Sequence, residues 1–310
     1  MRIVFFGTPD FATPPLLALI GEGHDVVAVV TQPDKPRGRS RSSFDPSPVK
    51  VIALAESIPV LQPERPRGDA AFARHIRELA PDISVVVAYG HILPQEVIDM
   101  PRLGTLNIHA SLLPEYRGAA PIQAAIRDGR TETGVSIMQM VPALDAGPVL
   151  LTLRTPIASD ETAGELTLRL AELGAEALIE ALVLLSVGKA PATPQNDALA
   201  SYAKKIVRED ARLPFDGPSD RVARVVRAFD PKPGAWGVLN GVEVRCFGAQ
   251  SEESRSGPPG EVIEAGDHGI VIACGEGAVR IADVHPAGSK RLAAAQWVRG
   301  RGVRIGDRFE

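Results

Sequence analysis

Two polar residues, Asn107 and His109, lie two positions apart in a stretch where polar and apolar side chains alternate. This alternation predicts a strand over 105–109, and residues two apart on a strand project from the same face. A neutral imidazole accepts a proton near pH 7. A neighbouring amide can donate to a developing oxyanion, a contact worth roughly 3–4 kcal/mol in acyl-transfer sites. The pair indicates a site for proton transfer and oxyanion stabilisation.

A carboxylate and a hydroxyl could extend this chemistry. Asp145 is the one ionisable residue of the tight loop 141–148, VPALDAGP. Next to His109, a carboxylate would hold the tautomer of the ring and favour its charged form. Ser111 lacks the G-x-S-x-G pattern of a nucleophile elbow, so backbone capping or ligand contact is the better interpretation. Because His–Asp pairs are also common in protein cores, the residue types only suggest acyl transfer.

The elements that must position these residues follow the order of an α/β fold. Apolar strands over 2–6 and 25–31, with a helix over 11–21 between them, form the βαβ unit of a parallel sheet. Strands without alternation fit a sheet that is covered on both faces. Further strands are predicted over 58–61, 83–89, 133–140 and 149–157, and further helices over 48–56, 69–79, 122–128 and 162–187.

The character of the chain changes after a segment rich in proline and polar residues at 188–197. A helix over 219–229 leads into short strands separated by glycine turns, a pattern typical of a small β-barrel. These strands are predicted over 235–239, 242–247, 260–264, 269–273 and 278–284. We expect a catalytic domain over 1–189, a linker over 190–205 and a C-terminal domain over 206–310.

Composition excludes several classes of protein. With 310 residues, 45% of them hydrophobic, and a net charge of −4, the chain is globular and no obvious nucleic-acid binder. It shows no signal peptide and no apolar run near the roughly 18 residues of a membrane span, so we expect a cytoplasmic protein. Cys246 and Cys274 lie apart without a CxxC pattern, which predicts two reduced, buried thiols and no metal.

Three loops could face a ligand. The turn after the first strand, GTPDFA, has Pro9 in place of the second glycine of G-x-G-x-x-G, which argues against a dinucleotide there. The long polar loop 32–48 is either solvated or a phosphate contact. Its basic residues are Lys35, Arg37, Arg39 and Arg41. His91 follows a strand at the ligand-binding end of the sheet, although a lone histidine in a turn is more often structural.

The run NIHASLLPEYRGAAPIQ resembles the signature of the folate-dependent formyltransferases. FFGTPDFA, TQPDKPRGR, SPVK, VVVAYGHILP, TGVSIMQM and LDAGPVL are similar to blocks of one branch of that family, and AFDPKPGAW and HPAGSKRLAAAQW to its second domain. The resemblance implies transfer of a formyl group from 10-formyltetrahydrofolate to the α-amine of methionine on initiator tRNA, in translation initiation. It also implies a Rossmann-like N-terminal domain and an OB-like, open β-barrel C-terminal domain that binds tRNA.

The resemblance assigns roles to individual positions. Asn107, His109 and Asp145 match the catalytic trio. The positions implied to bind folate are Ser111, Leu112, Leu113 and Pro114, with Val87, Ala88, Tyr89, Gly90, Ile92 and Leu93 around the pterin. Lys35, Arg37, Arg39 and Arg41 match the basic loop that reaches toward the tRNA acceptor end, although here arginines and an extra acidic residue replace the usual lysines. We expect a monomer that needs no metal and no membrane.

Three alternatives remain beside this interpretation. Within the superfamily, they are formylation of an amino sugar nucleotide and hydrolysis of 10-formyltetrahydrofolate. The sugar enzymes commonly carry a fused dehydrogenase domain, and no second βαβ series follows here. The hydrolases lack the combination of TPDFA, TQPD and the basic loop. A non-enzymatic RNA-binding module is the third, and the intact Asn107, His109 and Asp145 set argues against it.

Overall fold

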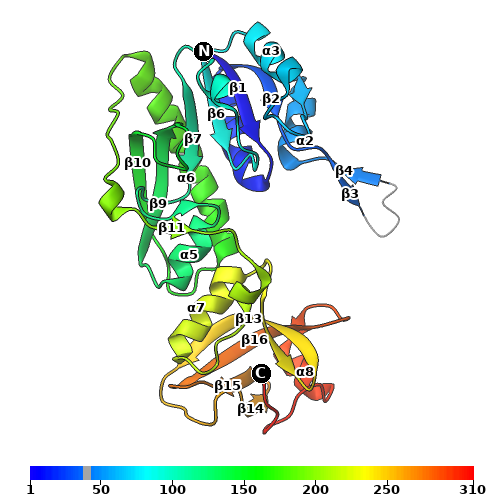
Figure 1. Ribbon diagram of the computed structural model, residues 1–310. Helices are drawn as coiled ribbons and strands as arrows, with labels where there is room; N and C mark the ends of the chain where they lie inside the picture. The colour runs from blue at the N-terminus through cyan, green and yellow to red at the C-terminus, as the bar shows by residue number, and fades with distance from the viewer. Residues whose placement is uncertain (38–42) are drawn as a thin grey trace. The chain divides into compact units, whose positions relative to one another are not determined.

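The computed structural model describes residues 1–37 and 43–310, which divide into two units (Figure 1). Unit 1 holds Met1–Gly118, Thr133–Thr155 and Thr167–Tyr202, and unit 2 holds Ala119–Glu132, Pro156–Leu166 and Ala203–Glu310. Unit 2 therefore takes segments from the middle of the chain as well as its C-terminal part.

Unit 1 is built on a seven-stranded sheet of order β10-β9-β7-β6-β1-β2-β5. The strands are β1 (Arg2–Gly7), β2 (Asp25–Val30), β5 (Val60–Leu61), β6 (Ile83–Val87), β7 (Thr105–His109), β9 (Glu132–Gln139) and β10 (Val149–Pro156). β1 pairs in parallel with β2 and β6, and β6 pairs in parallel with β7. The predicted parallel sheet is thus confirmed at its centre, but β9 runs antiparallel to β7.

Two helices of the first unit, α2 and α3, begin at residues whose side chains cap them. The helices of this region are α1 (Thr13–Gly21), α2 (Pro48–Ala55), α3 (Ala70–Glu78), the unpredicted α4 (Gln95–Ile98) and α6 (Ala163–Ser186). The Ser47 hydroxyl accepts from the Lys50 amide at 3.1 Å, and the Asp69 carboxylate from the Phe72 amide at 2.9 Å, so each satisfies a free amide of the first turn. α3 buries Phe72 and Ile76 in a core with side chains of β1 and β6.

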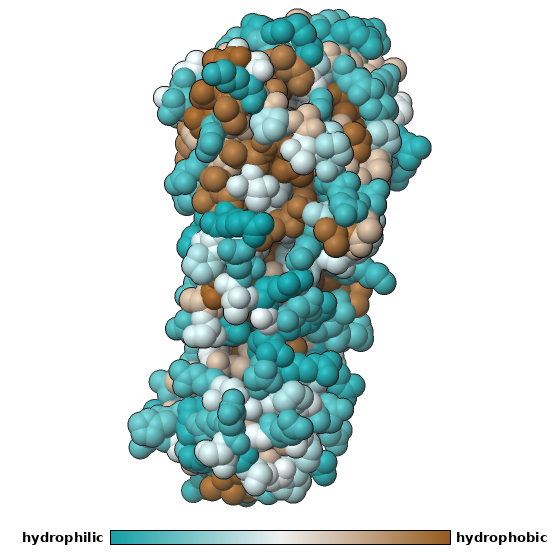
Figure 2. Space-filling view, turned by 90° about the vertical axis from the view of Figure 1, so that its left-hand side faces the viewer, coloured by the Kyte–Doolittle hydropathy of each residue, from teal (hydrophilic) through white to brown (hydrophobic). Residues whose placement is uncertain are grey.

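Unit 2 is an antiparallel sheet of order β12-β13-β16-β15-β14, with β17 beside β16. Its strands are β12 (Ala235–Leu239), β13 (Val242–Glu252), β14 (Val262–Gly266), β15 (Gly269–Ala273), β16 (Ala278–Pro286) and β17 (Leu292–Ala293), and its helices are α5 (Pro121–Arg127), α7 (Ser219–Phe229) and α8 (Ala294–Arg299). β13 and β16 pair from Val244 to Glu252, so both strands run further than the predicted 242–247 and 278–284. Hydrophilic residues dominate the face of unit 2 seen in Figure 2.

The two cysteines are buried and free, which confirms the prediction. Among the described residues, no helix combines the length and the apolar character needed to cross a membrane. The same part of the chain shows no group of three or more His, Cys, Asp or Glu side chains placed to ligate a metal.

The last residues connect the two edges of the unit 2 sheet. Glu310 exchanges backbone hydrogen bonds of 2.8 and 3.0 Å with Val238 of β12, and the Phe309 amide donates to Gly260, just before β14, at 2.8 Å. Because one short segment reaches both edge strands, the sheet must curve, and it forms the open β-barrel that the sequence predicts. The Phe309 ring is 2% exposed and lies 5.7 Å from the Phe215 ring.

Replacing Phe309 with alanine should destabilise unit 2 by about 3–5 kcal/mol, the usual range for a large buried aromatic side chain. Trp236 and Trp297, the two tryptophans of the chain, both lie in unit 2, so denaturant unfolding followed by tryptophan fluorescence measures this unit. Val242→Ala, at a position 44% exposed in the same unit, is the matched control and should leave the midpoint nearly unchanged. Equal shifts for the two variants would contradict the role of Phe309.

Candidate active site

His109, the last residue of β7, has a defined tautomer. Its ring is buried, and its Nε2 lies 2.9 Å from the Tyr116 carbonyl oxygen. Since a carbonyl only accepts, Nε2 carries the proton, and Nδ1 of the neutral ring is left with a lone pair. That Nδ1 lies 3.7 Å from Oδ2 of Asp145, too far for a direct hydrogen bond but close enough to stabilise a protonated ring. The Tyr116 carbonyl, rather than the expected Asp145, therefore holds the tautomer.

Asp145 reaches His109 by folding back along β7. In the antiparallel pairing of β7 with β9, Gln139 lies beside Leu106 and Ser136 beside His109. The loop 141–148 therefore leaves the sheet near the start of β7, three residues or roughly 10 Å from His109. The chain must cover this distance in the reverse direction before Asp145 can meet the imidazole.

The loop around Asp145 depends on a glycine and a left-handed residue. Asp145 itself has φ +49°, and a Cβ on Gly147 would lie only 1.7 Å from the Gln139 carbonyl oxygen, so only glycine fits there. Oδ2 of Asp145 accepts the Gly118 amide at 2.8 Å. This hydrogen bond fixes the carboxylate on the side that faces His109.

Asn107 lies on the same strand and the same face as His109, as the spacing predicts. Its side chain is partly exposed, and its amide has no hydrogen-bond partner among the described residues. The backbone around it is fixed on both sides, by Val86 of β6 and Met138 of β9. Asn107 therefore presents a free amide donor from a rigid strand.

Ser111 forms hydrogen bonds that stabilise the loop after β7. Its buried hydroxyl donates to the Glu115 carbonyl at 2.6 Å, and its own carbonyl accepts from the Ser136 hydroxyl at 2.8 Å. The Leu113 amide also donates to the Ser136 hydroxyl, at 3.2 Å. These hydrogen bonds support the capping interpretation of Ser111. The next three residues, Leu112, Leu113 and Pro114, are partly exposed.

The segment after β6 divides its side chains between core and surface. Val87, Tyr89 and Leu93 are buried, whereas Ala88, Gly90 and Ile92 are exposed. The Tyr89 ring packs at 5.5 Å against Phe6, and burial raises its pKa. Its carbonyl accepts hydrogen bonds from Thr8 and Gln32. What this segment can offer a ligand is therefore backbone and small or exposed side chains.

His91, considered above as a site residue, packs its ring 5.5 Å from that of Tyr89. The contact accounts for its presence in the turn after β6 without a catalytic role, which favours the structural interpretation.

Gln195 holds the Asp145 loop in place, a role that the sequence did not indicate. Its Nε2 donates to the carbonyls of Asp145 and Gly147 at 2.8 and 2.7 Å. Its Oε1 accepts from Nε and Nη2 of the buried Arg117 at 3.0 and 2.8 Å. One amide thus joins the 141–148 loop to the segment that carries Tyr116 and Gly118. Arg117 could be found in the YRG motif, but Gln195 lies in a proline-rich stretch without such a signal.

The segment 32–48, predicted to be a loop, is partly regular, because two short strands within it form an antiparallel ribbon. β3 (Lys35–Arg37) pairs antiparallel with β4 (Ser43–Asp45). Strands of three residues with Lys, Pro and Arg carry no strand pattern, so the prediction missed them. Lys35 is exposed. Arg39 and Arg41 lie outside the described residues.

A polar cluster anchors the base of this ribbon. Nζ of Lys50 lies 2.5 Å from Oδ2 of Asp34 and 2.8 Å from Oε1 of Gln62, and Nε2 of Gln62 lies 2.7 Å from Oδ1 of Asp34. The hydrogen bonds from Lys50 and then Gln62 hold the pKa of Asp34 below its ordinary value. The Thr31 and Ser47 hydroxyls meet at 2.7 Å across the two ends of the segment. The TQPD and SPVK motifs therefore build one support for the ribbon.

The chain thus combines an α/β sheet, an antiparallel second unit and a His–Asp pair shielded from solvent. The family model described as Formyl transferase matches residues 1–182, and the one described as Formyl transferase, C-terminal domain, matches residues 205–302. The chain therefore belongs to the formyl transferase family.

Relatives and solved structures agree with this membership. The chain is 50% identical over 309 residues to methionyl-tRNA formyltransferase of Stenotrophomonas maltophilia, and the match covers 99% of this chain and all of that one. It is 48% identical over 301 residues to methionyl-tRNA formyltransferase of Pseudomonas paraeruginosa, and the match covers 97% of this chain and 96% of that one. HypX from Aquifex aeolicus, in complex with tetrahydrofolic acid, superposes with a TM-score of 0.68 at 24% identity, covering 96% of this chain and 47% of HypX. An N-formyltransferase from Helicobacter canadensis, in complex with folinic acid and dTDP-3-aminofucose, superposes with a TM-score of 0.70 at 18% identity. The match covers 94% of this chain and 100% of that one.

Replacing Gln195 with alanine should loosen the loop that carries Asp145. The variant loses two hydrogen bonds to the loop and two from Arg117. The two to the loop, each worth about 1 kcal/mol, should by themselves speed hydrogen exchange at the Gly118 amide by roughly tenfold or more. Asn196→Ala is the matched control, because the Asn196 side chain caps only the adjacent Ala198 amide. If Gly118 exchanges equally fast in both variants, Gln195 does not hold the loop.

Proposed function

We propose that this chain transfers the formyl group of 10-formyltetrahydrofolate to the α-amino group of methionyl initiator tRNA. The observation that carries the proposal is the 50% identity, over 99% of the chain, to an enzyme named for this reaction. The residue geometry supplies a fitting chemistry, with Asn107 as a free amide donor and His109 with a lone pair on Nδ1. The enzyme then works in the cytoplasm as a monomer.

Asn107, His109 and Asp145 are the proposed catalytic residues. The methionyl amine attacks the formyl carbon, and a new C–N bond forms while the Asn107 amide stabilises the oxyanion. Nδ1 of His109 takes the proton of the amine, directly or through a water, and the carboxylate of Asp145 stabilises the imidazolium. The same proton passes to the folate nitrogen as its bond to the formyl carbon breaks, which restores the neutral ring.

The co-substrate is assigned to the two segments that follow β6 and β7. HypX binds tetrahydrofolic acid in its solved structure, which supports a folate in this fold. In this chain Ala88 and Gly90 are small, exposed residues with φ of +46° and +84°, which supports a contact between a planar pterin and the backbone of this segment. The proposed folate contacts are Val87, Ala88, Tyr89, Gly90, Ile92 and Leu93, together with the loop of Ser111, Leu112, Leu113 and Pro114.

The proposal also assigns a separate role to each domain. We assign catalysis to residues 1–189, a linker to 190–205 and tRNA binding to 206–310. The limits of the two family matches, 182 and 205, support these boundaries. The ribbon that carries Lys35 and Arg37, with Arg39 and Arg41 beyond the described residues, is the proposed contact with the acceptor end of the tRNA.

A sugar nucleotide is the second candidate acceptor, because the Helicobacter canadensis structure holds dTDP-3-aminofucose in the same fold. At 18% identity that likeness concerns the fold alone. Incubation of the chain with 10-formyltetrahydrofolate and either methionyl-tRNA or a dTDP-amino sugar decides between them. Formyl-methionine on the tRNA is the expected product, and formylation of the sugar alone would overturn the proposal.

His109→Ala should lower kcat by about 10²–10⁴-fold, the usual contribution of a general acid–base group, while the Kd for folate stays within a few-fold of its original value. Formyl-methionyl-tRNA formation gives kcat, and fluorescence titration gives the Kd. His75→Ala, which removes an exposed imidazole from α3, outside the proposed site, is the matched control and should keep near-normal turnover. Near-normal turnover of His109→Ala would contradict its assignment.

Lys35→Ala should weaken tRNA binding and lower the salt dependence of log Kd by about 0.7–0.9, the contribution of one phosphate contact. Filter binding at several salt concentrations measures this slope. Lys189→Ala removes the same charge from an exposed position of unit 1 beyond the end of α6, and should leave the slope unchanged. An unchanged slope for Lys35→Ala would count against the ribbon as a tRNA contact.

A further inference from the structure

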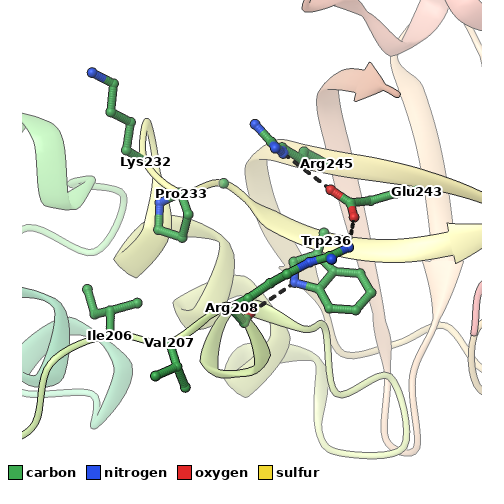
Figure 3. Close-up of a pocket in the computed structure, with 9 residues that line it drawn as sticks. Ile206, Val207, Arg208, Lys232, Pro233, Trp236, Glu243 and Arg245 are labelled. Carbon is green, nitrogen blue, oxygen red and sulfur yellow. Dashed lines mark hydrogen bonds and ion pairs between the residues drawn. The ribbon is translucent and has the colours of Figure 1, made fainter. Parts of the chain in front are cut away.

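The segment 190–205, proposed above as a linker, divides between the two units. Unit 1 ends at Tyr202, and residues 206–208 already line a pocket of about 480 Å³ in unit 2 (Figure 3). The residues before that point, 193–202, form hydrogen bonds with other parts of unit 1. Thr193, for example, exchanges backbone hydrogen bonds of 2.9 and 3.0 Å with the start of β10. Most of the proposed linker is therefore a fixed part of unit 1.

Ser201 holds two consecutive backbone amides next to the proposed active site. Its hydroxyl oxygen accepts from the Tyr116 amide at 2.9 Å, and its carbonyl oxygen accepts from the Arg117 amide at 2.9 Å. The Arg117 amide and the Tyr116 carbonyl belong to one peptide group, and this carbonyl accepts from Nε2 of His109. A single peptide group therefore connects the imidazole of His109 with Ser201.

Tyr116 needs this support because its backbone is strained. Its φ is +57°, in the left-handed region that residues with a bulky side chain rarely adopt. The two hydrogen bonds to Ser201 lie on either side of the Tyr116 Cα atom, at its own amide and at that of Arg117. They stabilise the strained conformation and, with it, the direction in which the Tyr116 carbonyl points.

Two acceptors compete for the single proton of the neutral His109 ring. The Tyr116 carbonyl lies 2.9 Å from Nε2, and the Asp145 carboxylate lies 3.7 Å from Nδ1. Because a carboxylate is the stronger acceptor, the proton stays on Nε2 only while the carbonyl is held within hydrogen-bond distance and the carboxylate is not. The hydrogen bond from the Arg117 amide to Ser201 also polarises the peptide group, which strengthens the Tyr116 carbonyl as an acceptor.

We propose that Ser201 is a positioning residue that keeps the lone pair of His109 on Nδ1, an inference that rests on the proposed function because this lone pair is the proposed base. Ser201 acts through Tyr116, since its hydroxyl and its carbonyl fix the peptide group that accepts from Nε2. If this peptide group turned away, the proton would move to Nδ1 and hydrogen bond to Asp145. The lone pair would then lie on Nε2, on the wrong side of the ring for the substrate amine.

The kinetic test compares serine variants of the full chain in formyl-methionyl-tRNA formation. Ser201→Ala should lower kcat about tenfold, the effect of one lost hydrogen bond to a buried group, and should change KM for 10-formyltetrahydrofolate by less than about twofold. Ser201→Thr keeps the hydroxyl and should restore kcat. Ser186→Ala is the matched control and should keep the original kcat, because the Ser186 hydroxyl donates to the Val183 carbonyl within α6.

The second measurement follows the His109 ring itself, which a purely stabilising role of Ser201 would not affect. Nitrogen NMR of isotope-labelled histidine shows which ring nitrogen carries the proton, and the signals of His109 are those lost in His109→Ala. The original chain should carry the proton on Nε2. In Ser201→Ala the fraction of rings with a free Nδ1 should fall by the same factor as kcat. Ser201→Thr and Ser186→Ala should match the original chain.

An unchanged tautomer in Ser201→Ala, or an equal loss of kcat in Ser186→Ala, would overturn the proposal. If Ser201→Ala does not fold, Ser201→Cys has a weaker acceptor at the same place and should move the proton in the same direction. The NMR measurement needs no substrate. A chain that forms no formyl-methionine, but moves the ring proton in Ser201→Ala, would therefore contradict the proposed function alone. Normal formylation with an unmoved proton would contradict the role of Ser201 alone.

Discussion

The hydrogen bond from Nε2 of His109 to the Tyr116 carbonyl is the constraint on which the site depends. It decides which ring nitrogen can accept a proton, and the contacts that hold Asp145 act on the remaining nitrogen, Nδ1. The Gly118 amide holds the Asp145 carboxylate next to this atom, and Gln195 holds the loop that carries Asp145. The proposed catalytic base is therefore oriented by three segments that are distant in sequence and joined mainly through backbone carbonyls and amides.

Much of the fold could be predicted because the sheet strands are continuous apolar runs and the second domain repeats short strands between glycines. The sequence also placed Asn107 and His109 on one face, since this follows from strand geometry alone. It could not show that β9 reverses direction next to β7, because pairing direction depends on contacts between distant segments. Because β9 is antiparallel to β7, the loop after β9 must run back along β7 to bring Asp145 to His109, and the Gln195 amide holds the loop there. Neither feature produces a pattern in the nearby sequence.

The same limit applies to the basic ribbon. The charges of the 32–48 segment are visible in the sequence, but its support comes from Lys50 on α2 and Gln62 after β5, which lie 16 and 28 residues from Asp34. The TQPD and SPVK motifs are thus explained by packing at the base of the ribbon rather than by contact with a ligand. The charge of the ribbon can be read from its composition. The polar cluster that supports it cannot, because Lys50 and Gln62 come from other parts of the chain.

The burial of the two free cysteines has a practical consequence for studying this chain. Burial raises the pKa of Cys246 to about 12 and that of Cys274 to about 11. At neutral pH only about one thiol in 10⁴ or fewer is then a reactive thiolate, and neither sulfur is accessible to a reagent. A cysteine introduced at an exposed position would therefore be the single target of a maleimide dye. The folded chain can be labelled at one chosen site, for distance or mobility measurements, without first removing its own thiols.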